Sequence, residues 1–127
     1  RDPMYITFGL GIYSGGTNGM GIYDGTNQYF INNTAMQGIN DGNWNHIVMT
    51  HDGTNLKGYI NGSIIDTVST GTTTQFSGGT NYNRIGVRAD GNTASAYDGD
   101  IDQVRIFNDS LTSDEVTQLY NNEIACS

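Results

Sequence analysis

Apolar and polar residues alternate along much of the chain, and this two-residue period is typical of half-buried β-strands. Residues 4–13 have the clearest alternation, with Met4, Ile6 and Phe8 on one face. Turn sequences such as Asp-Gly and Asn-Gly separate the runs that follow. We therefore expect strands at residues 4–13, 20–24, 28–32, 45–51, 55–60, 63–70, 82–88 and 101–108.

A helical period occurs only near the end of the chain, at residues 111–123. The apolar residues with this spacing are Leu111, Val116, Leu119 and Tyr120. Thr112 and Glu115 fit the capping box that begins many helices. We expect one short C-terminal helix.

Many short strands followed by one late helix indicate an all-β fold, an antiparallel β-sandwich or jelly roll. The composition agrees, because 18 glycines and a hydrophobic share of 35% are typical of a turn-rich β protein. A chain of 127 residues is long enough for one core. No repeat or linker divides it, so we expect residues 1–127 to form a single module.

The charge of the chain excludes several classes of partner. Its net charge is −8, and only five Lys or Arg residues are present. Such a surface repels nucleic acids and anionic membranes, and no apolar run reaches membrane-spanning length. Cys126 is the single cysteine, so no internal disulfide can form. We expect neither nucleic-acid binding nor membrane insertion.

The segment "GDIDQVRIFN", residues 99–108, carries the densest group of carboxylates. Asp100 and Asp102 lie within it, and Asp98 lies just before it. Three carboxylates in five residues fit a catalytic cluster, a metal site or the polar start of a strand.

Two blocks of sequence resemble laminin-G-like, concanavalin A-like jelly rolls. Residues 41–62 contain a Gly-x-Trp-x-His strand, an Asp-Gly turn and a Tyr-x-Asn-Gly hairpin. Residues 99–122 resemble the closing strand and helix of the family, in the expected order. The closing block is similar to modules of phage virion and tail-fibre proteins and of bacterial surface proteins. The resemblance implies an extracellular, cell-surface or virion location.

The resemblance also implies strands that precede residue 4 in related domains. The chain looks like the later part of a module within a longer protein, and it begins with Arg1 rather than Met. Because unpaired sheet edges are usually avoided, we expect a homo-oligomer, strands supplied by a neighbour or a trimmed module.

Glycoside hydrolysis is the enzymatic activity that this fold family would imply. The glucanases of the fold carry Glu-x-Asp-x-x-Glu on one strand, so that acid and nucleophile lie about 5 Å apart. The two glutamates here, Glu115 and Glu123, both fall in the expected helix. Nucleophile-elbow, phosphate-loop and dinucleotide motifs are also absent. We expect a non-enzymatic protein with no catalytic residues.

Calcium is the metal that the resemblance implies. Asp102 matches an aspartate that helps to hold a structural Ca²⁺ in related jelly rolls, a role suited to oxygen ligands. The alternative is that Asp102 accepts a hydrogen bond from a backbone N–H at the start of the strand. Asp98 and Asp100 are weaker candidates.

His46 and His51 do not predict a zinc site. Residues five apart on a strand lie on opposite faces, and no cysteine is near. His46 shares a face with Trp44 and Val48, and the resemblance treats the Trp-x-His pair as structural. We expect His46 to pack near the core.

Outward-facing tyrosines and the loops beside them are candidates for carbohydrate binding, because sugars bind flat aromatic rings flanked by polar groups. The candidate residues are Tyr13, Tyr23, Tyr82, Tyr97, Asn81 and Asn92. We expect a recognition module that binds a glycan or a cell surface. Its protein partners should be copies of itself or other modules of the same protein. The alternative is a structural role in which the module assembles a fibre, filament or capsid.

Overall fold

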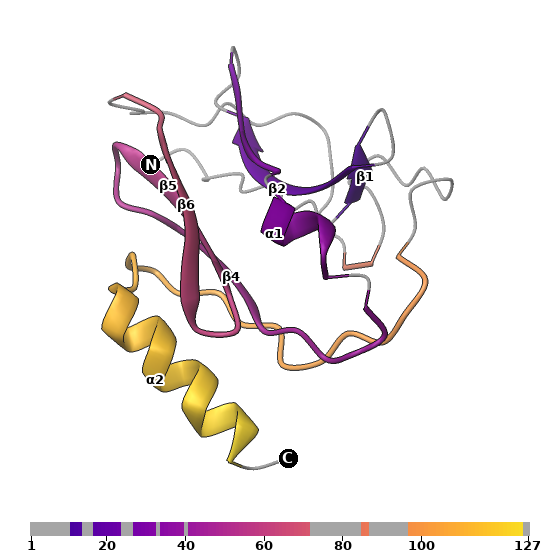
Figure 1. The fold of residues 1–127 in the computed structure, drawn as a ribbon. Helices are drawn as coiled ribbons and strands as arrows, with labels where there is room; N and C mark the ends of the chain where they lie inside the picture. Colours follow the sequence, from indigo (N-terminus) through magenta and orange to yellow (C-terminus); the bar gives the residue numbers. More distant parts are fainter. Residues whose placement is uncertain are drawn as a thin grey trace.

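A computed structural model describes residues 11–13, 17–23, 27–32, 34–39, 41–71, 85–86 and 97–125, and all that follows concerns these residues. They form two antiparallel three-stranded sheets and two helices (Figure 1). The first sheet and the short helix after it are β1 (Gly11–Tyr13), β2 (Thr17–Tyr23), β3 (Gln28–Ile31) and α1 (Thr34–Gln37). The second sheet and the C-terminal helix are β4 (Ile47–His51), β5 (Asn55–Ile60), β6 (Ser63–Ser69) and α2 (Ser113–Ile124).

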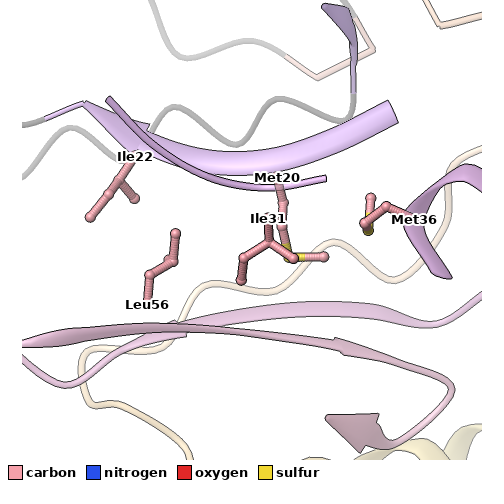
Figure 2. Packing of buried hydrophobic residues seen from close by; sticks show 5 residues of the cluster. All are labelled: Met20, Ile22, Ile31, Met36 and Leu56. Carbon is pink, nitrogen blue, oxygen red and sulfur yellow. The ribbon is translucent and has the colours of Figure 1, made fainter. Parts of the chain in front are cut away.

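The two sheets face each other across a small apolar core (Figure 2). Met20, Ile22 and Ile31 extend from β2 and β3 toward Leu56 of β5. Met36 of α1 is buried in the same cluster. Burial of each such side chain contributes about 1.5–3 kcal/mol to folding, so these five residues hold the sheets together.

Both turns of the second sheet follow from their sequences. In the β4–β5 turn, Asp52 Oδ1 accepts hydrogen bonds from the backbone N–H groups of Thr54 at 3.0 Å and Asn55 at 2.8 Å. In the β5–β6 turn, Asn61 and Gly62 have φ of +50° and +78°. An Asn-Gly pair adopts these left-handed angles readily, which fixes the register of the hairpin.

Helix α2 begins with the capping box that the sequence predicts. Thr112 accepts from the Glu115 backbone N–H, and Glu115 accepts from the Thr112 N–H at 2.8 Å. The helix packs on the second sheet through buried Val116. Thr117 Oγ1 also donates to the Gly62 carbonyl at 2.9 Å, so the helix is fixed to the β5–β6 turn.

The predicted fold class agrees with the observed mostly β structure, with its antiparallel sheets and C-terminal helix. The expected strands at 28–32, 45–51, 55–60 and 63–70 are confirmed within one or two residues by β3 to β6. Helix α1 was not expected, and β2 begins at Thr17, three residues before the strand expected at 20–24. Residues 4–10, 24, 82–84 and 87–88 of the expected strands lie outside the described residues.

The expected closing strand at residues 101–108 is wrong. This segment has no regular secondary structure, and Val104 and Ile106, which should face the core, are exposed. The cause is local in part, because Gln103 has a φ of +55° and interrupts the extended backbone. Among the described residues, no strand pairs with this segment.

Candidate functional site

The loop that leads into β4 presents the one tryptophan of the chain to solvent. We call residues 41–46 the Trp44 loop. The Trp44 side chain is 70% exposed, which is unusual for the largest apolar side chain. The loop starts as an Asx turn, in which Asp41 Oδ1 accepts from the Asn43 N–H at 2.9 Å. Gly42 supplies the left-handed φ of +78° that this turn requires.

Asn45 fixes the shape of the Trp44 loop. Its Nδ2 donates to Asp41 Oδ1 at 3.1 Å and to the Ile39 carbonyl at 3.2 Å. Its Oδ1 accepts from Asn61 Nδ2 at 3.0 Å. The loop is therefore bound to the segment before it and to the β5–β6 turn, while Trp44 projects outward.

His46 closes the loop at the edge of the second sheet. Its backbone N–H donates to Asn61 Oδ1 at 2.9 Å, and its carbonyl accepts from the Asn61 N–H at 2.8 Å. Its side chain is only 14% exposed, and its ring centroid lies 5.7 Å from that of Tyr120 in α2. His46 is thus half-buried against α2, and it is not part of the core cluster of the described residues.

Glu123 of α2 joins this end of the sheet to the segment before the helix. Its Oε2 lies 3.5 Å from His46 Nε2, and its Oε1 lies 2.9 Å from Arg105 Nη1. Arg105 Nη2 also donates to Gln103 Oε1 at 2.7 Å. Figure 1 shows the orange segment before α2 passing close to the segment that enters β4. We call His46, Glu123 and Arg105 the α2 latch.

Two pKa values at the site are shifted downward. Hydrogen bonds from Asn43, first from its backbone and then from its side chain, lower the pKa of Asp41. This carboxylate therefore stays ionised at neutral pH. Burial lowers the pKa of His46, Glu123 opposes the shift and Arg105 adds to it. His46 is therefore mainly neutral at pH 7.

The Trp44 loop thus combines an exposed aromatic face with an ionised carboxylate and side-chain amides on a fixed backbone. Aromatic rings bind the apolar faces of sugars, and carboxylates and amides bind their hydroxyl groups.

The sequence matches the model of a known protein family. Residues 3–117 match Laminin_G_3, the concanavalin A-like lectin/glucanases superfamily. The chain belongs to this family. Its description covers both lectins and glucanases, and a β-sandwich is the fold that it implies for this Laminin_G_3 domain.

One solved structure resembles the Laminin_G_3 domain. It is an S-layer domain-containing protein from Clostridium thermocellum (residues 221–444), with 22% identity and a TM-score of 0.47. The match covers 83% of this chain and 52% of that one, so this domain spans about half of the relative's length. The search of curated proteins found no match.

The tyrosine and asparagine candidates predicted from the sequence are described only in part. Asn81, Tyr82 and Asn92 lie outside the described residues. Tyr13 and Tyr23 are in β1 and β2, where the structure describes the backbone alone. Tyr97 is 46% exposed, and its N–H donates to the Gly86 carbonyl at 2.7 Å. Tyr97 therefore remains a candidate.

The three aspartates near residue 100 are exposed and do not act as a cluster. Asp102 Oδ1 accepts from the Gln103 N–H at 2.7 Å, in a segment without regular secondary structure rather than at a strand entry. In the described part of the chain, no three His, Cys, Asp or Glu side chains gather to hold a metal ion. Calcium at Asp102 stays a prediction.

Both glutamates of the Laminin_G_3 domain already have structural partners. Glu115 belongs to the capping box of α2, and Glu123 belongs to the α2 latch. Both lie in the helix and not on a strand, as the sequence predicts. The strand-borne glutamates of the glucanase motif are therefore missing. No helix among the described residues is long and apolar enough to cross a membrane.

Sequence reasoning missed Trp44 as a site residue, because it treated the Trp-x-His pair as structural. His46 fits that interpretation, but Trp44 does not. The signal was the "DGN" before Trp44, since an Asp-Gly turn directly before a residue places it in the loop rather than in the strand.

Proposed function

We propose that this domain is a non-enzymatic carbohydrate-binding module and that Trp44 is the platform on which the sugar stacks. The observation that carries the proposal is the 70% exposure of Trp44 on a loop fixed by hydrogen bonds. Covering this ring with the apolar face of a pyranose would remove a large apolar area from water, which favours binding.

The shape of the loop supports the same proposal. Asn45 ties the loop to Asn61 and Asp41, so little conformational freedom is lost when a ligand binds. Asp41 stays ionised and offers a strong hydrogen-bond acceptor for sugar hydroxyl groups. A single site of this kind binds weakly, and we propose that several modules of one protein or one oligomer act together.

The proposal that the domain is not an enzyme rests on the positions of the glutamates. Retaining glycosidases need two carboxyl groups about 5–5.5 Å apart, one as acid and one as nucleophile. Glu115 and Glu123 are in the C-terminal helix, eight positions apart, and each is bonded to other groups. We propose that binding is the whole function and that it is exercised outside the cell, on a cell surface or a virion.

A glycan array probed with an oligomerised form of the domain tests the proposal. We expect Trp44→Ala to lower binding at least tenfold, which corresponds to about 1.4 kcal/mol. Tyr97→Ala is the matched control, because Tyr97 is a second exposed aromatic residue that could bind a sugar. Loss of binding in Tyr97→Ala alone would move the site away from Trp44. No binding of the parent domain to any glycan would contradict the function itself.

Calcium at Asp102 is a separate proposal from family resemblance. If Ca²⁺ is held there, Asp102→Ala should lower the melting temperature in calcium buffer but not in EDTA. Equal losses in both buffers would leave only the cap on the Gln103 N–H.

An assembly role is the second candidate, and a different observation favours it. Residues 101–107 expose four large apolar side chains, and Ile106 is 91% exposed. Contiguous exposed apolar residues are typical of protein–protein contacts. Light scattering tests this role: self-association that Ile106→Ser abolishes would support it, and a monomer at all concentrations would contradict it.

A further inference from the structure

The α2 latch brings together three parts of the chain that are distant in sequence. His46 comes from the Trp44 loop, Arg105 from the segment before α2 and Glu123 from the last turn of α2. Glu123 contacts both of the others, at 3.5 Å and 2.9 Å. Whatever changes the charge of His46 therefore acts on the helix and on the loop at once.

The two ring nitrogens of His46 differ in their polar partners. Its Nε2 faces the Glu123 carboxylate, so the neutral tautomer that fits this geometry carries its proton on Nε2. Its Nδ1 is buried and has no hydrogen-bond partner among the described residues. Protonation would place a new N–H on Nδ1 with no acceptor, and a buried donor without an acceptor destabilises the state that contains it.

The charges around the ring do not offset the destabilising effect of a buried Nδ1–H without an acceptor. The described groups that face His46 are Glu123 and Tyr120 of α2, Arg105 of the preceding segment and the neutral amide of Asn61. Glu123 favours the protonated ring, but its carboxylate is already paired with the Arg105 guanidinium. Burial of the ring and the Arg105 charge outweigh Glu123 and keep the pKa of His46 below its ordinary value.

The sign of the pH dependence follows from this imbalance. The folded state binds the His46 proton less readily than the unfolded state does. The contribution of the latch to stability is therefore complete above the ordinary histidine pKa near 6.5. It decreases as the pH falls through that value toward the lower pKa of the folded state.

The Trp44 loop responds because His46 is its last residue. The His46 backbone is bonded to Asn61, and Asn61 Nδ2 is bonded to Asn45, which shapes the loop. The α2 side of the latch reaches the same turn, since a Cβ on Gly62 would lie 2.9 Å from the Tyr120 ring. A shift of His46 away from α2 would disturb the base on which Trp44 stands.

We propose that His46, Glu123 and Arg105 form an acid-sensitive latch that holds α2 and the Trp44 loop in place at neutral pH and loosens both on acidification. The effect on ligand binding rests on the proposed function, whereas the loosening itself does not. The ligand would thus be held at neutral pH and released in a mildly acidic compartment.

Hydrogen exchange of the α2 amides between pH 7.5 and 4.5, corrected for intrinsic rates, tests the latch without any ligand. Fluorescence of Trp44, the single tryptophan, reports on the loop in the same samples. We expect α2 exchange to accelerate at least tenfold across this range. His46→Gln should abolish the acceleration, because glutamine does not titrate. The matched control is His51→Gln, the other histidine of the chain, which should keep it.

Three outcomes would overturn the latch: no acceleration in the parent domain, the same acceleration in His46→Gln, or its loss in His51→Gln alone. If His46→Gln fails to fold, Glu123→Gln decides instead. Removing the carboxylate that favours protonation should shift the midpoint to lower pH, and an unchanged midpoint would contradict the proposal. Glycan binding is measured separately at both pH values, so absence of binding at pH 7.5 counts against the proposed function and not against the latch.

Discussion

At the scale of single residues, close contacts between the sheets depend on the absence of a side chain at Gly58. A Cβ built on Gly58 would lie 2.9 Å from Met20 Sδ and 3.0 Å from Ile31 Cδ1, both in the core. These atoms end flexible side chains, so they can move, but the core around them is closely packed. The spacing of the two sheets is thus set partly by one glycine.

We therefore predict that Gly58→Ala destabilises the domain by about 1–3 kcal/mol, the usual effect of overpacking a core. Urea unfolding measures the change in the free energy of unfolding. Gly38→Ala is the matched control, because the nearest contact of a Cβ there is the Ala35 carbonyl at 3.5 Å. Equal effects of the two substitutions would show that Gly58 does not limit the approach of the sheets.

At the scale of elements, the β4–β5 hairpin depends on Asp52. Its carboxylate accepts from the backbone of Thr54 and Asn55 and lies 3.5 Å from Lys57 Nζ. The hydrogen bonds from Thr54 and Asn55 hold the pKa of Asp52 well below its ordinary value. Its stabilising effect is therefore present at neutral pH, begins to decrease as the pH falls below the ordinary aspartate value near 4, and is lost through the lower pKa of the folded state.

Asp52→Ala should lower the free energy of unfolding at pH 7 by about 1 kcal/mol, the typical effect of losing such a cap. The difference in the free energy of unfolding between the variant and the parent should shrink at pH 2–3. In this range the unfolded parent binds a proton at Asp52 more readily than the folded parent does. Urea unfolding at both pH values measures it. Asp66→Ala controls for the loss of a carboxylate from the same sheet, since the Asp66 carboxylate accepts from the N–H of the adjacent Thr67. A difference that stays constant with pH would contradict the assigned role of Asp52.

The sequence predicted some helices and strands correctly and others not, and the difference lies in how local their signals are. Strands β3 to β6 and helix α2 have local signals, namely alternation, Asp-Gly and Asn-Gly turns and the Thr112–Glu115 capping box. The segment at 101–108 also alternates, but Gln103 has a positive φ and no described strand pairs with the segment. The local sequence pattern predicts neither feature. The α2 latch of His46, Arg105 and Glu123 could not be predicted either, because its members are distant in sequence.

Trp44 illustrates the limit for the candidate site. The family resemblance implied a structural tryptophan, yet exposure is a property of the assembled fold. The position of the loop depends on Asn45 and Asn61, which are 16 residues apart and are bonded across the end of the sheet. Among the described residues, the aromatic side chain with the largest exposed fraction is Trp44, which the sequence did not indicate as a binding residue.

At the scale of the whole molecule, charge should decide which glycans reach the Trp44 loop. The net charge is −8, and Asp41 within the loop is held ionised. Anionic sugars would meet repulsion from the loop and from the surface as a whole, while neutral and amino sugars would not. On matched pairs of glycans that differ only by a sialic acid or a sulfate group, we expect stronger binding to the uncharged member.

The preference for the uncharged glycan should weaken as salt rises from 0.05 to 0.5 M, because added ions screen interactions between exposed charges. Asp41→Asn should reduce the preference while retaining Trp44, although it also weakens the Asx turn, so circular dichroism and Trp44 fluorescence must confirm an unchanged loop. A preference for sulfated or sialylated glycans that persists in high salt would place the binding surface away from this acidic loop.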